Sequence, residues 1–372
     1  MAGYFTGSCA VTGARFRLAI GSDDADLRAL LREIPMEGWV RLGLEREPSF
    51  FLGEGLLGKA TVMVAREEGD NGPLIGSCTC TWMPVHVNGE VRNIPYLGGL
   101  RLASAYRNHP HLIRQGFRAL DEMAGFGHGT PLAFTSLASE NHRARRLLEK
   151  GLPAFPQYTP MAELDTWVLP TVGKVVGRLE PAVSGDIPEL VKLINQTGSA
   201  SQFSPHLTEE WLASSPGGLR VEDFLIRQEG GVIQACLALW DQRAYKQVRV
   251  HGYRAPLNVL RTPWNMLATV RRGVRLPAPG SRLEACFLAF TAFQPDDWEE
   301  AAADVEEALA WAARRKVDAA LLGLPAGHPM STKLRKGRAP WIYRTCIEGV
   351  RWSDAPQVVL DLRPVHPEIA LL

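Results

Sequence analysis

The order of predicted elements runs twice along this chain, and that repetition constrains the fold more than any other feature. Residues 15–20 read as a short strand, and 22–31 follow with Ser22 as N-cap, an acidic first turn and apolar residues at helical spacing. The stretch 177–194 repeats this strand and helix, with Ser184 as the cap. Proline and glycines between the copies mark a boundary. The sequence therefore predicts two domains and a linker: 1–168, 177–372 and the linker 169–176.

Each half then continues with a meander of antiparallel strands and closes with strand, helix, strand. In the first half, Asn-Gly at 88–89 is typical of a hairpin turn. In the second half, apolar runs at 282–290 and 318–324 flank a helical pattern from about 298 to 316. Such patterns favour a sheet covered by helices. We expect a mixed α/β (α+β) fold of two domains, each a central, mostly antiparallel mixed sheet flanked by helices.

Composition excludes several classes of protein. Of 372 residues, 46% are hydrophobic and 22% are charged, and the formal net charge is +1. A charge this small provides no general attraction to nucleic acid or to an anionic membrane. No apolar run approaches the ~18 residues that span a bilayer, and the first residues lack a secretory signal. We expect a cytoplasmic protein that binds no nucleic acid; the sequence leaves its oligomeric state open.

The six cysteines are scattered, mostly in strand-like apolar runs. Cys78 and Cys80 alternate along one predicted strand, so both thiols point to the same face. No Cys-x-x-Cys or His-x-x-x-His spacing indicates zinc. We expect no metal, and buried free thiols at these positions: Cys9, Cys78, Cys80, Cys236, Cys286 and Cys346.

The segment 94–151 carries the residues with the most chemical content. A strand at 94–102 feeds a loop at 106–112, and an amphipathic helical pattern follows at 113–123. The first amides of a helix lack internal partners, and the helix dipole favours an anion there. Arginines in and after the loop add positive charge. The segment therefore predicts a local site for a phosphate group.

This order of segments resembles the GNAT superfamily of acyltransferases, which bind acyl-coenzyme A with such a strand, loop and helix. In that family the loop reads Arg or Gln, two residues, Gly, one residue, Gly or Ala. Here Arg107 takes the first position, whereas Pro110 and Leu112 replace the glycines, which removes one amide donor and adds bulk. The strand before the loop offers backbone groups to the pantetheine arm of the cofactor. The resemblance implies these cofactor-binding residues: Leu100, Leu102, Arg107, Asn108, His109, His111, Leu112, Asn141 and Ala144.

The next strand and helix extend the resemblance. Residues 131–137 read as a buried strand, and Ser139 is a plausible cap for the helix after it. Asn141 and Ala144 match the asparagine and alanine that face the pantetheine arm in GNAT enzymes. Leu148 stands where the family often has the tyrosine that protonates the departing thiolate. The resemblance therefore retains the residues that contact the cofactor, Asn141 and Ala144, whereas Leu148 replaces the tyrosine that usually serves as the acid.

Candidates for the missing acid–base chemistry lie on the strands around the expected cleft. Amine acylation must remove a proton from the attacking ammonium and benefits from an acid for the thiolate. We expect these groups among Tyr96, Ser136 and Tyr158, with Thr135 as a further hydroxyl. Some tandem relatives instead use the carboxylate of their last residue as the base; the last residues here, 367–372, are apolar. These alternatives stay open at the level of sequence.

The second half lacks the phosphate loop. The stretch 291–298 is acidic where a basic loop would stand, and no Asn-x-x-Ala helix follows residue 324. We expect a degenerate copy without its own coenzyme A site, which walls the acceptor groove. Residues 35–51 fall where GNAT enzymes place helices over the acceptor, and Trp39, Phe50 and Phe51 are candidates to line an apolar pocket there.

The function that the resemblance implies is N-acyl transfer. An acetyl or other acyl group would move from coenzyme A to a small-molecule or peptide amine by direct attack, without a metal. Two alternatives remain: a catalytically weak acyl-CoA-binding or scaffolding protein, and a transferase that takes aminoacyl groups from transfer RNA. The near-neutral charge is less favourable for the transfer RNA alternative.

Overall fold

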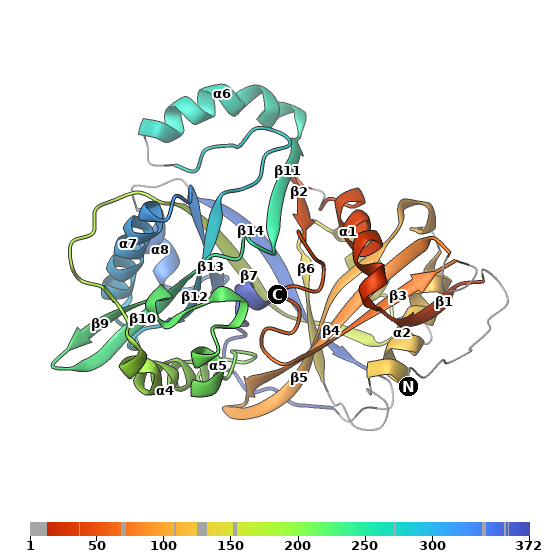
Figure 1. Ribbon diagram of the computed structural model, residues 1–372, viewed down its shortest axis with the longest axis horizontal. Helices are drawn as coiled ribbons and strands as arrows, with labels where there is room; N and C mark the ends of the chain where they lie inside the picture. Colours follow the sequence, from red (N-terminus) through yellow and green to blue (C-terminus); the bar gives the residue numbers. More distant parts are fainter. Residues whose placement is uncertain are drawn as a thin grey trace.

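The centre of the molecule, shown here by a computed structural model, is a continuous sheet of twelve strands with helices on both faces (Figure 1). The structure describes residues 13–36, 38–67, 72–107, 109–124, 132–151, 155–270, 273–336, 340–352, 355 and 357–372.

The first-half strands and helices are β1 (Arg15–Leu18), α1 (Asp24–Glu33), β2 (Val40–Glu45), β3 (Lys59–Arg66), β4 (Leu74–Val87), β5 (Glu90–Leu102), α2 (Pro110–Ala124), β6 (Ala133–Ala138), α3 (His142–Leu148) and β7 (Gln157–Pro170). The second-half strands and helices are β8 (Glu180–Pro181), α4 (Ile187–Gly198), α5 (Glu209–Ala213), β9 (Phe224–Glu229), β10 (Val232–Trp240), β11 (Gln247–Tyr253), α6 (Ala255–Val270), β12 (Ala285–Ala292), α7 (Trp298–Arg314), β13 (Ala319–Pro325), α8 (Met330–Arg335) and β14 (Trp341–Arg351). The predicted mixed α/β class is confirmed.

The two halves exchange strands at the middle of the sheet. The strand order is β1-β3-β4-β5-β6-β14-β7-β13-β12-β10-β9-β8. β14, from the end of the chain, lies between β6 and β7 and is antiparallel to both. β7, from the first half, pairs with β13 of the second half along its other edge. Each half of the sheet is therefore completed by a strand from the other half, and the sequence patterns did not predict this exchange.

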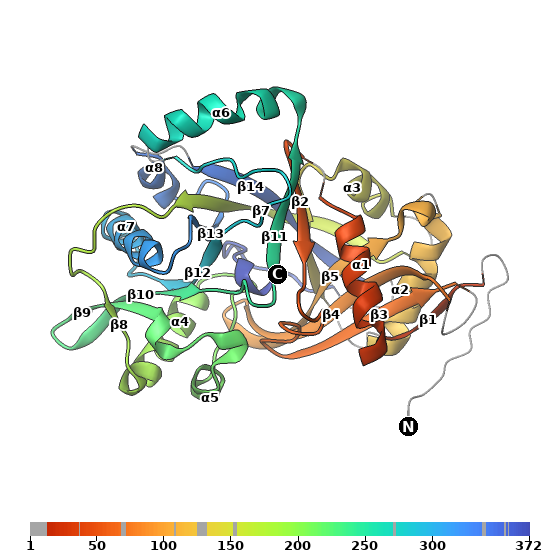
Figure 2. The ribbon, with the colours of Figure 1, turned by 45° about the horizontal axis from the view of Figure 1, so that its top comes forward.

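Helices cover the sheet differently on its two faces. In the second half, α7 and α8 cover one face and α4 and α5 the other, each over its own apolar cluster (Figure 2). In the first half, α2 and α3 pack on one face, where Cys78 and Cys80 both point. α1 packs on the other face, against Val62 and Val64. The five cysteines within the described residues are buried and free, as predicted; Cys9 lies outside them.

The predicted repeat extends to the start of the first helix in each half, but the predicted caps were wrong. The Asp23 carboxylate accepts a hydrogen bond from the Ile20 amide at 2.8 Å, and Asp186 accepts one from the Val183 amide at the same distance. Ser22 and Ser184 lie inside the short 3-10 turns that these aspartates close, η1 (Gly21–Asp23) and η3 (Ser184–Asp186). The carboxylate of an aspartate can accept a hydrogen bond from the free amide three residues before it, which is the role predicted for the serine.

The segment 35–51 contains a strand where the resemblance placed helices. β2 pairs with β11 of the second half in a separate two-stranded sheet over the middle of the molecule (Figures 1 and 2). Trp39 is 54% exposed, whereas Phe50 is buried with α1 and Phe51 packs beside it. β2 has a partner strand only because the second half supplies one, which the local pattern cannot indicate.

The loop at 202–206 makes a further link between the halves. It pairs with the end of β4: the His86 amide donates to the Ser204 carbonyl at 2.8 Å, and the Phe203 amide donates to the His86 carbonyl at 2.8 Å. The Phe203 ring stacks on Phe134 of β6, with centroids 4.7 Å apart and planes 5° apart. Both rings are buried. This stack ties the second half to the strand that carries the candidate site.

Phe203→Ala tests that link. Removing a fully buried ring should lower the free energy of unfolding by about 3–5 kcal/mol, because it loses burial and leaves a cavity against Phe134. Urea unfolding followed by tryptophan fluorescence measures the change. Leu362→Ala is the control, since Leu362 is fully exposed and should change the stability by less than about 0.5 kcal/mol. A loss below about 1 kcal/mol for Phe203→Ala would contradict the packing described.

Candidate functional site

Strands β5 and β6 separate from one another shortly after they meet. They are parallel neighbours, but their pairing covers only Tyr96 with Phe134 and Leu97 with Thr135. At that point the Thr135 hydroxyl donates to the Leu97 carbonyl at 2.5 Å. β5 then continues to Leu102 on a different course, because a bulge shifts its register with β4. The result is a gap between two parallel strands, which we call the first gap (β5 from Gly98 to Leu102 facing β6 from Ser136 to Ala138).

Tyr96 and Ser136 meet at the narrow end of the first gap. The Tyr96 hydroxyl and the Ser136 hydroxyl are 2.8 Å apart. Burial raises the pKa of Tyr96, and the hydrogen bond with Ser136 partly offsets that shift. A buried phenol of this kind stays protonated at neutral pH and is suited to donate a proton. The structure therefore brings together two of the three predicted catalytic hydroxyls.

Tyr158, the third, lies in a different apolar cluster. It packs on the face of the sheet covered by α2, with its ring 6.2 Å from Phe117. Tyr96 belongs to the cluster that contains Phe134 and Phe203. Burial raises the pKa of Tyr158 far above its usual range. The structure does not bring Tyr158 to the Tyr96–Ser136 pair.

The predicted phosphate loop lies between the short turn η2 (Ser104–Tyr106) and α2. Arg107 is exposed. The His109 and His111 rings are perpendicular, 5.4 Å apart, and each has one buried nitrogen, Nδ1 and Nε2 respectively, without a hydrogen-bond partner in the described part of the chain. Two unpaired imidazole nitrogens at the start of a helix suit an anionic ligand. Asn108 lies outside the described residues.

Leu112 faces the protein interior. Its side chain is 2% exposed and packs with Ala65 and Ile75. Its amide donates to the His109 carbonyl at 3.0 Å. Leu100, by contrast, is 41% exposed, and Leu102 is half-buried, so the outer part of β5 borders solvent.

Asn141 and Ala144 meet at the first turn of α3. The Asn141 side-chain oxygen accepts a hydrogen bond from the Ala144 amide at 3.2 Å, so Asn141 and not Ser139 is the cap, which corrects that prediction. Arg143 joins this turn to the phosphate loop, since its guanidinium donates to the Arg107 carbonyl at 3.0 Å. The strand, loop and helix that the resemblance singled out therefore converge around one gap.

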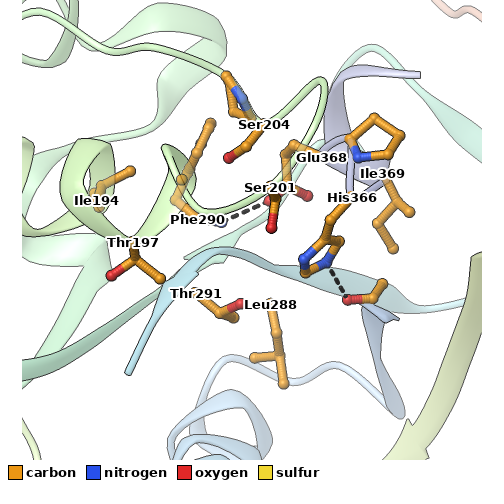
Figure 3. A pocket seen from close by; sticks show the side chains of 14 residues that line it. Ile194, Thr197, Ser201, Ser204, Leu288, Phe290, Thr291, His366, Glu368 and Ile369 are labelled. Atoms are coloured by element: carbon orange, nitrogen blue, oxygen red, sulfur yellow. Dashed lines mark hydrogen bonds between the residues drawn. The ribbon is translucent and has the colours of Figure 1, made fainter. Parts of the chain in front are cut away.

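The second half contains an equivalent gap, and the chain's own last residues fill it. β12 and β13 are parallel, and their pairing ends at Leu288 and Leu322. The His366 ring is hydrogen-bonded to the Gly323 carbonyl at 3.1 Å, and the Glu368 carboxylate accepts the Phe290 amide at 2.7 Å (Figure 3). A cavity of about 60 Å³ remains beside these side chains, room for one or two waters.

Charged side chains from both halves form a group that sequence reasoning missed, and two of them, Arg46 and Glu54, act electrostatically on Tyr96. Arg46, which follows β2, forms an ion pair with Glu54 at 2.9 Å, and both side chains are largely buried. The Lys246 ammonium donates to the Leu372 backbone oxygen at 2.7 Å. Arg46 and Glu54 act electrostatically on both Tyr96 and Lys246, which places the pair between the halves. No motif marks these residues, because three distant segments bring them together.

Neither a metal site nor a membrane span is evident in the part of the chain that the structure describes. No cluster of three or more His, Cys, Asp or Glu side chains there is arranged to hold a metal ion. Likewise, none of its helices combines the length and apolar character that crossing a membrane requires.

Comparisons with known proteins agree with this arrangement at the level of fold. No family model matches the sequence, and no curated protein matches it either. The structure is similar to that of N-myristoyltransferase from Saccharomyces cerevisiae with bound myristoyl-CoA, with a TM-score of 0.60 and 10% identity over 97% of this chain and 85% of that chain. It is also similar to a GCN5-related N-acetyltransferase from Sphaerobacter thermophilus, with a TM-score of 0.53 and 11% identity over 95% of this chain and 98% of that chain. The predicted resemblance to the GNAT superfamily is confirmed in fold, across nearly the whole chain.

Lys246→Met tests the electrostatics of the charged group. Burial lowers the pKa of Lys246 from 10.5 to about 7. Between pH 7 and pH 10.5, Lys246 is protonated in the unfolded chain but mostly deprotonated in the folded chain. Lys246 therefore makes the free energy of unfolding rise with pH, by at most ~1.4 kcal/mol per pH unit. Lys246→Met should remove that contribution and be more stable than the parent at pH 7.

Urea unfolding at pH 7, 8 and 9 measures how the free energy of unfolding changes with pH. Lys192→Met, at an exposed helical position, is the control. Equal slopes in the parent and Lys246→Met would contradict the assignment.

Proposed function

We propose that the chain is an N-acyltransferase that moves an acyl group from coenzyme A to an amine by direct attack, with its site at the first gap. The observation that carries the proposal is the Tyr96–Ser136 hydrogen bond at the narrow end of this gap, in a fold shared with two kinds of N-acyltransferase. A gap between parallel strands exposes backbone groups that a pantetheine arm can bind in strand-like fashion.

The donor would lie along this gap, with its pyrophosphate at the loop before α2. Arg107, His109 and His111 would bind the phosphates, with the two unpaired imidazole nitrogens replacing the amide that Pro110 lacks. The outer part of β5, at Leu100 and Leu102, and the turn at Asn141 and Ala144 would border the pantetheine. The second half would hold no donor, because residues 366–368 fill its gap.

The chemistry follows from where the thioester would lie. The amine nitrogen gives up its extra proton to solvent, attacks the carbonyl carbon and forms the C–N bond. It then loses a second proton, which through solvent returns the Tyr96 phenolate to the phenol after Tyr96 has protonated the sulfur. The C–S bond breaks, and the sulfur leaves as a thiolate that takes up a proton. Tyr96 would supply that proton and Ser136 would orient its hydroxyl, because the raised pKa of Tyr96 keeps the phenol protonated. Tyr96 would then take the role of the family tyrosine that Leu148 replaces.

The donor is tested by binding and turnover of acetyl-, octanoyl- and myristoyl-CoA. We expect calorimetry to show binding of at least one of them and an amine panel to show release of the thiol. His109→Ala and His111→Ala should weaken binding of coenzyme A thioesters by about tenfold each, the value of one charge-assisted hydrogen bond, but leave binding of the matching acyl-pantetheine unchanged because it has no pyrophosphate. No binding at millimolar concentration would overturn the proposal, and binding without turnover would favour the scaffolding alternative.

The proton donor is tested by Tyr96→Phe. We expect kcat to fall by roughly 10²-fold while donor affinity stays within threefold, since only proton transfer is removed. Ser136→Ala should have a smaller effect in the same direction. Tyr158→Phe is the matched comparison for the third predicted hydroxyl, and we expect less than a threefold change from its position in the α2 cluster. A Tyr96→Phe variant with the parent kcat would remove Tyr96 from the mechanism.

A further inference from the structure

Arg101 is a guanidinium without an ionic partner at the open side of the first gap. Its Nη1 donates to the neighbouring Leu100 carbonyl at 3.1 Å. Its Nε is buried and has no hydrogen-bond partner among the described residues, and no described carboxylate forms an ion pair with it. Burial lowers the pKa of Arg101, and Tyr96 and Tyr343 offset part of that shift. Arg101 is half-buried, and a cation drawn partly out of water without a carboxylate partner is suited to bind an anion.

Arg101 faces the same side of the sheet as the proposed proton donor. In the antiparallel pair with β4, Arg101 lies opposite Ser77 and Tyr96 lies opposite Thr81. Residues 77 and 81 point to the same face of β4, because side chains alternate along a strand. The electrostatics agree with this placement: burial raises the pKa values of Tyr96 and of Tyr343 on β14, and the charge on Arg101 offsets part of each shift. Arg101 therefore lies on the Tyr96 side of the sheet, within electrostatic reach of both tyrosines.

Arg46 adds a second, partly satisfied cation on that side of Tyr96. One of its terminal nitrogens pairs with Glu54, but the other, Nη1, is buried without a hydrogen-bond partner in the described part of the chain. A β-carbon added at Gly53 would lie only 3.3 Å from this nitrogen, and closer still to the Tyr245 ring, so the guanidinium is held between two segments. Glu54 pairs with Arg46, and both Glu54 and Glu368 act on Lys246, whose pKa burial lowers. Arg101 is therefore the cation that has no carboxylate partner among the described residues.

We infer that the acceptor amine carries a carboxylate, which binds to Arg101 with Arg46 nearby. The inference rests on the proposed function and names the class of acceptor: amino acids, or small peptides with a carboxylate close to the amine. A planar guanidinium can donate two parallel hydrogen bonds to a carboxylate, but a neutral carbonyl offers only one oxygen. The attraction between the two charges is strongest in a site that excludes water. The carboxylate then positions the amine nitrogen beside the thioester without taking part in the reaction.

Matched acceptor pairs test the inference, namely glycine with glycinamide, β-alanine with β-alaninamide and Gly-Gly with its amide. For the parent chain we expect KM of at least one carboxylate form to be 10- to 100-fold below that of its amide. Arg101→Met should raise KM for the carboxylate form by that factor and leave kcat, and KM for the amide, within threefold. Arg101→Lys should restore part of the affinity, because it keeps the charge but loses the planar pair of donors. Arg92→Met is the control, since Arg92 lies on the same strand in an exposed ion pair with Glu90.

The kinetic outcomes distinguish a failure of the carboxylate site at Arg101 from a failure of the proposed N-acyltransferase function. Equal KM values for carboxylate and amide forms, with turnover present, would overturn the inference and leave the proposed function standing. So would an Arg101→Met variant that loses kcat equally on both forms, because Arg101 would then act on the reacting atoms.

A binding measurement covers the case without turnover. Calorimetry with N-acetylglycine and N-acetylglycinamide, using parent chain and Arg101→Met, measures the carboxylate site directly. If no acyl-CoA is turned over, binding of N-acetylglycine that Arg101→Met abolishes would still support the carboxylate site, and no binding would overturn it. Arg101→Met should unfold at a urea concentration close to that of the parent, since it removes a charge without an ion-pair partner and replaces the side chain with one of similar length.

Discussion

The rest of the structure depends on the pairing of β14 between β6 and β7. β6 is short and central, and without β14 its outer backbone groups would be buried without partners. The strand that satisfies them comes from about two hundred residues later in the chain, and it also pairs with β7 from Gln157 to Val168. The first half therefore completes its sheet only when the last strand of the second half is in place. This couples the two halves more strongly than a linker between separate domains would.

That coupling positions the candidate site. The first gap opens because β5 leaves β6 after two paired residues, with Thr135 holding the point of separation and a bulge against β4 turning β5 aside. β6 can keep its course because β14 supports it on the other edge. Phe203, from the second half, then stacks on Phe134 beneath the gap. Tyr96 and Ser136 are held at hydrogen-bonding distance by elements from both halves.

The two gaps of the molecule differ in what occupies them. In the second half, His366 and Glu368 take up the backbone groups that β12 and β13 expose. In the first half, two arginine nitrogens, Arg46 Nη1 and Arg101 Nε, are buried and lack hydrogen-bond partners within the described residues. Low dielectric makes such groups costly when unpaired and effective when a ligand pairs them. In the second half the chain's own residues pair these backbone groups, while in the first half some polar groups are left for a ligand under the proposed function.

The sequence by itself determined the local elements and their repetition. Helical spacing, the Asn-Gly turn between β4 and β5 and the capped start of each half are short-range features, and the structure contains them within a few residues of their predicted bounds. Even there, the side chain that accepts a free amide at the start of a helix was not the predicted serine. Asp23 and Asn141 accept these amides, because their side-chain oxygens lie within hydrogen-bonding distance. Only the tertiary structure decided the strand exchange, the pairing of β2 with β11, and the electrostatic grouping of Arg46, Glu54 and Arg101 with Tyr96. Strand partners and charge clusters are relations between distant segments, and no local pattern records them, because the free energy that selects them appears only when those segments meet.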